Sequence, residues 1–260
     1  MNRCNVMRRA LPLLIGMVLS LAGCAGKQYE PYEQHERIVV VDPGHGGVDP
    51  GAIGSTGKLP EKEIALRMGL ALRDQLEATG RYQVIMTRDD DRTVRLCDRL
   101  QIARRSQGEL LISIHADSLT TAPEVSGASV YTLSELASDH EPARLASNQE
   151  CADIPAGIDL SNEDIVPEML IDLAQRDAES ITLAELLAQE LNRATKLVKR
   201  RPAQEGFVVL KSPDMPAVLI ELGYLSTPAD EKALADDAHI ARLATAVARA
   251  VDVYFGGGPS

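Results

Sequence analysis

Two histidines and a glutamate of this chain of 260 residues have positions in the sequence from which they could form a reactive centre. His45 follows the β-branched run Ile38–Val41 in a glycine-rich loop, and His115 directly follows a second apolar run, Leu110–Ile114. Glu61 begins a helical pattern just after the loop that holds His45. Because ligands of open α/β sheets gather at the carboxyl ends of the strands, we expect these three side chains to converge at one sheet edge.

Two imidazoles and one carboxylate form the ligand set of a hydrolytic zinc site, in which a fourth position stays open for water. A lone histidine is more often structural, but this chain holds only five, and two of them stand at equivalent strand ends. The sequence therefore predicts one zinc ion per chain, bound by His45, Glu61 and His115.

A further carboxylate, Glu221, directly follows the apolar run Val218–Ile220. A carboxylate at the end of a core strand is costly unless it is paired, ligating or catalytic. Hydrolysis at a metal needs a group that takes a proton from water and returns it to the leaving amine, and Glu221 suits that role. A structural salt bridge to an arginine is the alternative.

Strand and helix patterns alternate along the chain, which indicates an α/β fold with a largely parallel sheet. Short apolar runs predict the strands, and apolar residues at helical spacing predict the helices. The expected strands cover residues 38–41, 82–87, 110–114, 125–131, 207–210 and 217–220, and the expected helices cover residues 61–79, 94–106, 159–173, 182–198 and 239–254.

The N-terminus has the layout of an export signal. Three arginines precede a short apolar run, Leu11–Leu21, which is too short to span a bilayer as a stable helix. The run ends in Leu21–Cys24 (LAGC), which resembles the lipobox of bacterial lipoproteins, although a plain signal peptide with an incidental cysteine is the alternative. We expect a lipoprotein signal peptide over residues 1–23, lipidation of Cys24 and a polar tether over residues 24–36.

The net charge of −11 argues against nucleic acid or anionic lipid as the main partner. Contact with a membrane is therefore expected only through the lipid anchor. Once the signal peptide is removed and Cys24 is lipidated, Cys97 and Cys151 remain. They either form a disulfide in an oxidising compartment or stay as two buried thiols.

Four blocks of the sequence resemble the zinc-dependent N-acetylmuramoyl-L-alanine amidases of bacterial cell-wall turnover. The resemblance runs from about Arg37 to Phe255 and implies a catalytic domain over residues 37–256, with a twisted, mostly parallel sheet of about six strands flanked by helices (phosphorylase/hydrolase-like). Glu63 and Thr227 stand where Asp and Asn are usual, and neither touches the proposed ligands. The blocks are Asp42–Gly47 (DPGHGG), Glu61–Glu63 (EKE), Ser113–Ser118 (SIHADS) and Leu219–Ser226 (LIELGYLS).

The resemblance implies that His45, Glu61 and His115 bind zinc and that Glu221 is the catalytic carboxylate. The implied substrate is peptidoglycan, cut at the amide between the lactyl group of N-acetylmuramic acid and L-Ala of the stem peptide. In this metal-assisted hydrolysis, Glu221 accepts a proton from water and passes it to the amine of L-Ala.

The segment from about residue 133 to 200 resembles an insertion of family members that drive cell separation, in which a helix lies over the zinc until an activator moves it. Residues 157–160 and 164–173 match that segment, and Glu163 or Glu168 is the candidate pseudo-ligand at the open zinc position. The resemblance implies a catalytically inactive metallopeptidase-like domain as the activator. A solvated acidic helix without a regulatory role is the alternative.

Other functions share parts of this pattern. A zinc carboxypeptidase or endopeptidase acting on the stem peptide would use the same ligands, so only the cleavage product separates it from an amidase. Loss of a ligand or of Glu221 would favour a non-catalytic wall-binding lipoprotein, and none is lost. Polar residues at the ends of buried strands argue against a structural outer-membrane anchor. Ala25, and not an aspartate, follows the lipobox-like cysteine, and the resemblance to bacterial lipoproteins then implies a lipid-anchored periplasmic protein at the outer membrane.

Overall fold

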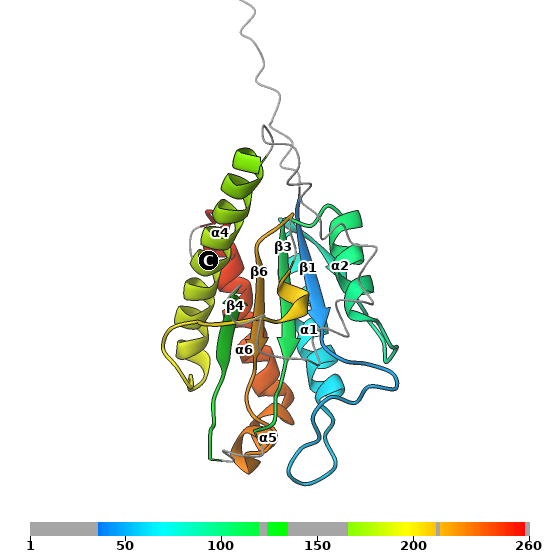
Figure 1. Cartoon of the computed structure of the whole chain (residues 1–260). Coiled ribbons are helices and arrows are strands. Elements are labelled where there is room, and N and C mark those ends of the chain that lie inside the picture. Colours follow the sequence, from blue (N-terminus) through cyan, green and yellow to red (C-terminus); the bar gives the residue numbers. More distant parts are fainter. Residues whose placement is uncertain (1–35, 120–123, 135–165, 212–213, 258–260) are drawn as a thin grey trace, which may run out of the picture. The chain divides into compact units, whose positions relative to one another are not determined.

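The computed structural model describes residues 36–119, 124–134, 166–211 and 214–257, with the backbone alone for residues 166–173 (Figure 1). They belong to the second of two units into which the chain divides, His35–Ser260. No helix within these residues has the length and apolar character needed to cross a bilayer. The expected signal peptide, Cys24 and Glu163 fall outside the described residues, as does the side chain of Glu168.

A six-stranded sheet forms the centre of this unit, in the order β2-β1-β3-β6-β4-β5. Strands β2, β1, β3 and β6 are mutually parallel, whereas β4 runs antiparallel to β6 and parallel to β5. The α/β fold with about six mostly parallel strands is therefore confirmed. The strands are β1 (Arg37–Pro43), β2 (Tyr82–Met86), β3 (Leu110–His115), β4 (Ser129–Leu133), β5 (Ala203–Glu205) and β6 (Ala217–Glu221).

Helices cover both faces of the sheet. On one face pack α1 (Glu61–Glu77), α4 (Val166–Ala194) and α6 (Asp237–Tyr254), and Figure 1 shows α1 and α6 behind the strands. The other face carries α2 (Leu96–Arg105) and the short 3-10 helix η2 (Val208–Leu210). A further short helix, α5 (Pro228–Leu234), follows the last strand and contacts α6.

Consecutive residues of a strand point to opposite faces, and the apolar runs of this chain fill both faces. In β1, Val39 and Val41 join the larger core with α1 and α6, whereas Val40 joins the smaller core with α2. In β3, Ile112 joins the larger core and Leu111 joins the smaller one. Burial on both faces explains why continuous apolar runs, rather than alternating ones, mark the central strands.

Some local predictions were wrong. The segment predicted as a strand over residues 207–210 instead holds η2, Val208–Leu210. Hydrogen bonds close this turn from Leu210 N–H to the Phe207 carbonyl (3.1 Å) and from Lys211 N–H to the Val208 carbonyl (3.0 Å). The sixth strand is instead the polar segment Ala203–Glu205 at the sheet edge.

The helical predictions also need correction. Instead of separate helices over residues 159–173 and 182–198, the described chain forms one continuous helix, α4. Hydroxyl groups in its middle donate to carbonyls four residues earlier, Ser180 to Arg176 (2.9 Å) and Thr182 to Ala178 (2.8 Å), so these polar side chains are satisfied within the helix. The helix α5 was absent from the prediction.

Cys97, near the start of α2, is disulfide-bonded. The other three cysteines lie outside the described residues, and so does its partner. The bond excludes the free-thiol alternative for Cys97, while its pairing with Cys151 stays a prediction.

The parallel register brings several strand ends to one edge of the sheet. Pro43, the last residue of β1, is level with Ile114 of β3, and His115 is level with Glu221 of β6. The N–H of Gly44 donates to the Ile114 carbonyl (2.9 Å), which extends the pairing one residue beyond β1. The residues that immediately follow these strands therefore meet at the carboxyl edge.

Candidate metal centre

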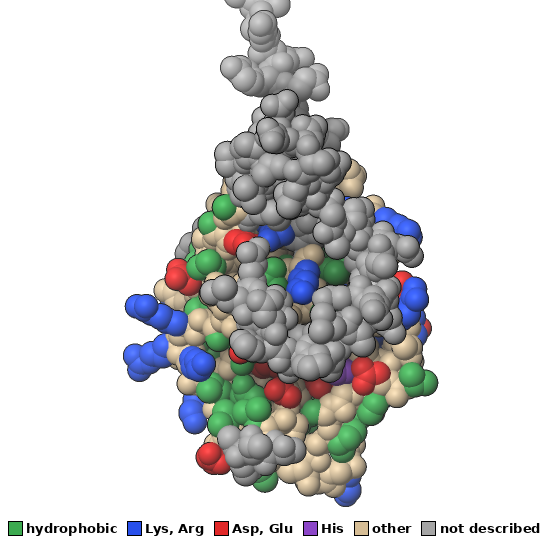
Figure 2. All heavy atoms as spheres, viewed as in Figure 1, with side chains coloured by type: hydrophobic (Ala, Val, Ile, Leu, Met, Phe, Trp, Pro, Cys, Tyr) green, Lys and Arg blue, Asp and Glu red, His purple; other side chains and the backbone are tan. Residues whose placement is uncertain are grey.

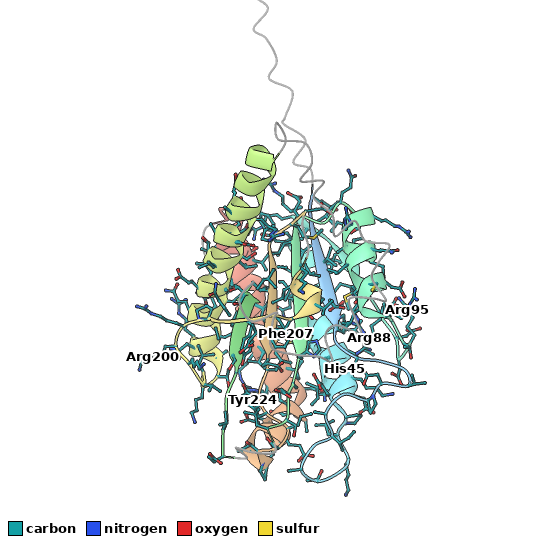
Figure 3. The ribbon with its side chains drawn as sticks, viewed as in Figure 1. His45, Arg88, Arg95, Arg200, Phe207 and Tyr224 are labelled. Atoms are coloured by element: carbon teal, nitrogen blue, oxygen red, sulfur yellow. The ribbon has the colours of Figure 1, made fainter. Side chains whose placement is uncertain are left out.

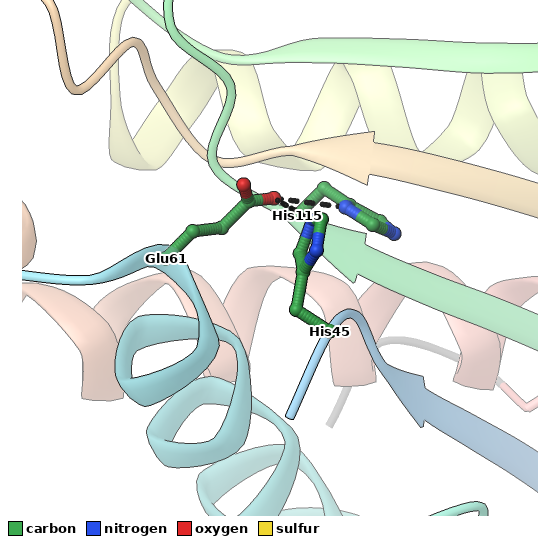
Figure 4. Close-up of side chains that lie close together, drawn as sticks. All are labelled: His45, Glu61 and His115. Atoms are coloured by element: carbon green, nitrogen blue, oxygen red, sulfur yellow. Dashed lines mark hydrogen bonds and ion pairs between the residues drawn. The ribbon is translucent and has the colours of Figure 1, made fainter. Parts of the chain in front are cut away.

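His45, Glu61 and His115 meet at the carboxyl edge of the sheet, as Figure 4 shows. One ligand atom from each side chain lies within 4.8 Å of the other two. Glu61 Oε1 is 3.0 Å from His45 Nε2 and 2.8 Å from His115 Nδ1. The imidazole centroids are 4.9 Å apart, and the rings meet at 79°. The convergence expected from the strand ends is thus present.

Backbone amides hold both oxygens of the Glu61 carboxylate. Oε1 accepts from the N–H of Ala116 (3.0 Å) and Oε2 from the N–H of Ala52 (2.9 Å). Burial raises the pKa of Glu61, but hydrogen bonds and charges from His115 and His45 more than offset this, and its pKa lies well below the usual range. Glu61 is therefore an anion at neutral pH, as a metal ligand must be.

His45 is oriented from its far side by a residue that the sequence analysis did not single out. Its Nδ1 is 2.8 Å from Asp49 Oδ2. Because a carboxylate only accepts, Nδ1 carries the proton and Nε2 is the nitrogen left to bind a metal. Burial lowers the pKa of His45, but Glu61 and Asp49 raise it overall. The spacing of four residues within one tight loop was an available signal for Asp49.

Glycine is required where the loop backbone approaches the ligands. A Cβ on Gly44 would lie 2.3 Å from Cε1 of His115. A Cβ on Gly51 would lie 2.6 Å from Oε2 of Glu61, and Gly51 also has a φ of +66°. These two glycines let the loop close around the cluster without displacing its side chains.

Two buried arginines hold the backbone that carries His45. Arg99 donates to the carbonyls of His45 and Pro43, both at 2.7 Å. Arg88, which is fully buried and labelled in Figure 3, donates to the carbonyls of Pro43 (2.9 Å) and Gly44 (2.7 Å). His45 has a φ of 58°, a left-handed conformation that persists only where the surroundings hold it. The arginines supply that support.

Asp42 balances positive charge beneath the loop. Its Oδ1 accepts from Arg99 (2.7 Å) and Thr87 (2.6 Å), and its Oδ2 accepts from Ser113 (2.8 Å). Burial raises the pKa of Asp42, but the Arg99 charge and the three hydrogen bonds lower it overall. The side chain is therefore an anion at neutral pH, and the Asp42–Arg99 pair lies in the protein interior.

Glu221 lies beside the cluster, level with His115 on the neighbouring strand. It is 6% exposed, and its Oε2 accepts from the N–H of Asp117 (2.8 Å), a partner that does not support the alternative of a salt bridge to an arginine. Burial raises the pKa of Glu221 well above its usual value, and the charges of Glu61 and Asp117 raise it further. A raised pKa favours the protonated form, as a group that takes up and returns a proton requires.

The donor set fits a hydrolytic zinc ion. Two imidazole nitrogens and one ionised carboxylate oxygen face one another, and a protonatable carboxyl group stands next to them. Zinc takes such ligands tetrahedrally and leaves a position for water or substrate. The site can therefore combine a Lewis acid with a proton carrier, which is the requirement for hydrolysis of an amide.

Comparisons with known proteins agree on one family. The sequence profile of the N-acetylmuramoyl-L-alanine amidases matches residues 39–253. The N-acetylmuramoyl-L-alanine amidase AmiA of Escherichia coli (strain K12) is 38% identical over 224 residues, which cover 85% of this chain and 76% of AmiA. AmiC of Neisseria meningitidis serogroup B is 37% identical over 220 residues, which cover 84% of this chain and 52% of AmiC, so this chain spans about half the length of that relative.

Solved structures give the same fold. The amidase AmiC2 of Nostoc punctiforme superposes with a TM-score of 0.62 at 28% identity, covering 85% of this chain and 97% of AmiC2. An N-acetylmuramoyl-L-alanine amidase from Clostridium difficile 630 superposes with a TM-score of 0.66 at 24% identity, again covering 85% and 97% of the two chains.

Proposed function

The chain belongs to the N-acetylmuramoyl-L-alanine amidase family, and on that premise we propose that it hydrolyses peptidoglycan with the help of one zinc ion. The bond cut is the amide between the lactyl group of N-acetylmuramic acid and L-Ala of the stem peptide. The observation that carries the proposal is the meeting of His45, Glu61 and His115 beside the buried carboxyl group of Glu221.

Each of these residues has a distinct role in the proposed reaction. Bound zinc would supply the Lewis acidity that polarises the scissile carbonyl. Glu221 accepts the proton of the attacking water and delivers it to the amine of L-Ala, and its raised pKa lets it hold that proton between the two steps. Asp49 accepts the Nδ1 proton of His45 and so leaves Nε2, which faces the ligand cluster, as the nitrogen that would bind the metal.

Removal of the metal should abolish hydrolysis reversibly. Chelated protein should lose at least about 100-fold in activity, and one equivalent of Zn²⁺ per chain should restore it, because no other group at the site replaces the Lewis acid. Mg²⁺ should not restore activity, since it prefers oxygen ligands to imidazole. Release of soluble stem peptide from sacculi, measured with the metal content of the same protein, checks this, and activity that survives complete chelation would refute zinc dependence.

We also place the enzyme in the periplasm, acting in cell separation and anchored to the outer membrane through lipid on Cys24. The lipobox-like segment before Cys24 and the similarity to the AmiA amidase support this proposal. Membrane contact is through the anchor alone, and no nucleic acid is involved.

Regulation is proposed to come from the segment that precedes the core part of α4. A carboxylate, Glu163 or Glu168, would occupy the open zinc position until a catalytically inactive metallopeptidase-like activator displaces it. The later part of α4 cannot be the movable element, because Leu183, Leu187 and Leu191 lie in the main core. Any inhibitory element is therefore confined to the residues before them.

Deletion of residues 157–175 should raise wall hydrolysis about tenfold in the absence of an activator, because the substrate would no longer compete with an internal ligand. Glu163→Gln and Glu168→Gln separate the two candidate carboxylates, and Glu185→Gln, an exposed position later in α4, is the matched control. Initial rates of dye release from labelled sacculi give the comparison. Unchanged rates in the deletion variant, with zinc retained, would refute self-inhibition.

A further inference from the structure

A group of exposed cationic side chains follows α4, although the whole chain has a net charge of −11. They belong to the connection to β5, and we call Lys196, Lys199, Arg200 and Arg201 the basic strip; all four are exposed. The preceding Arg193 is paired with Glu190 at 2.5 Å. Among the residues that the structure describes, none of the four strip residues forms an ion pair.

The backbone of the basic strip is attached to the edge of the sheet that carries the candidate centre. Ala128 N–H donates to the Lys196 carbonyl (2.8 Å), and Ala128 forms a parallel bridge with Leu197. The next residue, Ser129, is level with Glu221 on β6. Since neighbouring strands lie about 4.8 Å apart, the backbone of Leu197 is about 10 Å from that of Glu221.

The candidate centre itself is acidic, and the charges are separated across the molecule. Figure 2 shows carboxylates beside a histidine on the viewed face and a gathering of Lys and Arg side chains at its left edge. Figure 3 shows Arg200 at that edge, extending away from the ribbon. Bound zinc would offset part of this negative charge, and a substrate with carboxylates of its own would be attracted further by cations that lie outside the centre.

We propose that the basic strip binds the carboxylates of the peptidoglycan stem peptide while its first amide is cut. This inference rests on the proposed function, because the stem begins at the L-Ala whose bond is broken. An extended peptide spans about 3.3 Å per residue, so about three residues of the stem cover the distance from Glu221 to the backbone of Leu197, which lies between Lys196 and Lys199. Free carboxylates in that part of the stem would meet flexible lysine and arginine side chains.

An anionic lipid surface is the other partner that such a strip could contact. The described unit begins at the amino end of β1, the edge of the sheet opposite the candidate centre. The backbone of the strip instead lies at the carboxyl edge, on the same side of the sheet as the catalytic groups. This placement favours the wall over the membrane as the partner.

The test replaces three strip residues by glutamine in the full chain loaded with zinc. KM for a muropeptide with a complete stem should rise about tenfold, with kcat within about twofold, because each exposed charge contributes weakly and three act together. Cleavage of N-acetylmuramoyl-L-alanine, which lacks the rest of the stem, should be unchanged. The strip variant is Lys199→Gln, Arg200→Gln, Arg201→Gln, and the matched control, at exposed positions on α2, α5 and α6, is Arg105→Gln, Lys232→Gln, Arg249→Gln.

An unchanged KM for the complete stem would overturn the proposal, and so would an equal rise for the truncated substrate or for the control variant. Loss of binding to phosphatidylglycerol vesicles with an unchanged KM would assign the strip to a lipid surface instead. If the wild-type protein and the variant that lacks residues 157–175 both cut neither substrate, the proposed function would fail by itself. Co-sedimentation with intact sacculi would then test the role of the strip separately. Equal binding by the strip variant and the wild type would refute that role.

Discussion

Replacement of Glu221 by glutamine should lower amide hydrolysis by about 10²–10⁴-fold and leave one zinc ion bound per chain. The amide keeps the size of the side chain and removes its capacity to take and return a proton. Glu221 is not among the three clustered ligands, so its loss should not release the metal. Glu63→Gln, which neutralises an exposed carboxylate near the start of α1, is the matched control and should retain full activity.

Substitution of a ligand should remove the zinc ion as well as the activity. His45→Ala and His115→Ala should lose zinc and activity together, because each removes one of two nitrogen donors. Metal content by elemental analysis and initial rates on purified sacculi, measured on the same preparations, separate the two classes of variant. Full turnover by Glu221→Gln, or zinc retention by both histidine variants, would contradict the assigned roles.

Replacement of Asp42 by asparagine should lower the free energy of unfolding by about 3–5 kcal/mol at neutral pH. The substitution leaves the Arg99 guanidinium buried without its carboxylate, beneath the backbone that carries His45. Asp98→Asn is the control, because it breaks an exposed pair with Arg95 on the same helix and should cost less than about 1 kcal/mol. Urea unfolding of the metal-free protein, with its disulfide intact, measures both.

The effect of Asp42→Asn should depend on pH in a defined direction. The folded pKa of Asp42 is below its ordinary value of 3.8, so the carboxylate contributes its full stabilisation above that pH. The contribution is lost as the pH falls below 3.8 toward the folded pKa, where the wild type binds a proton as well. The difference in the free energy of unfolding between wild type and variant should therefore become smaller from neutral pH to about pH 2.5. A gap that is constant with pH would show that the lost stability does not come from the charge.

The central fold and the four candidate residues could be predicted because local sequence determines them. His45, His115 and Glu221 each follow a run buried on both faces of a sheet, and a polar residue there stands out from its surroundings. The parallel order of β1, β3 and β6 then forces these strand ends to one edge. The first step is local, and the second follows from the parallel pairing that the alternation of strands and helices indicates.

The support beneath the site could not be predicted in the same way. Arg88 and Arg99 donate to main-chain carbonyls, which every residue carries, and the side-chain partner of Arg99, Asp42, lies 57 residues away in the sequence. Likewise, the valines in Phe207–Leu210 indicated burial but not conformation, and they pack against α2 from a 3-10 turn. The edge strand β5 pairs on one side only and lacks an apolar pattern.

The identity of the bond that is cut tests the account most directly. Purified sacculi should be digested with the zinc-loaded protein, and the products should be identified by mass spectrometry with zinc quantified on the same sample. We expect intact stem peptides that begin with a free L-Ala amine, glycan strands with free lactyl carboxylates, and one zinc ion per chain. Stem peptides cut internally, with the lactyl amide left whole, would contradict it and indicate a peptidase that uses the same ligands.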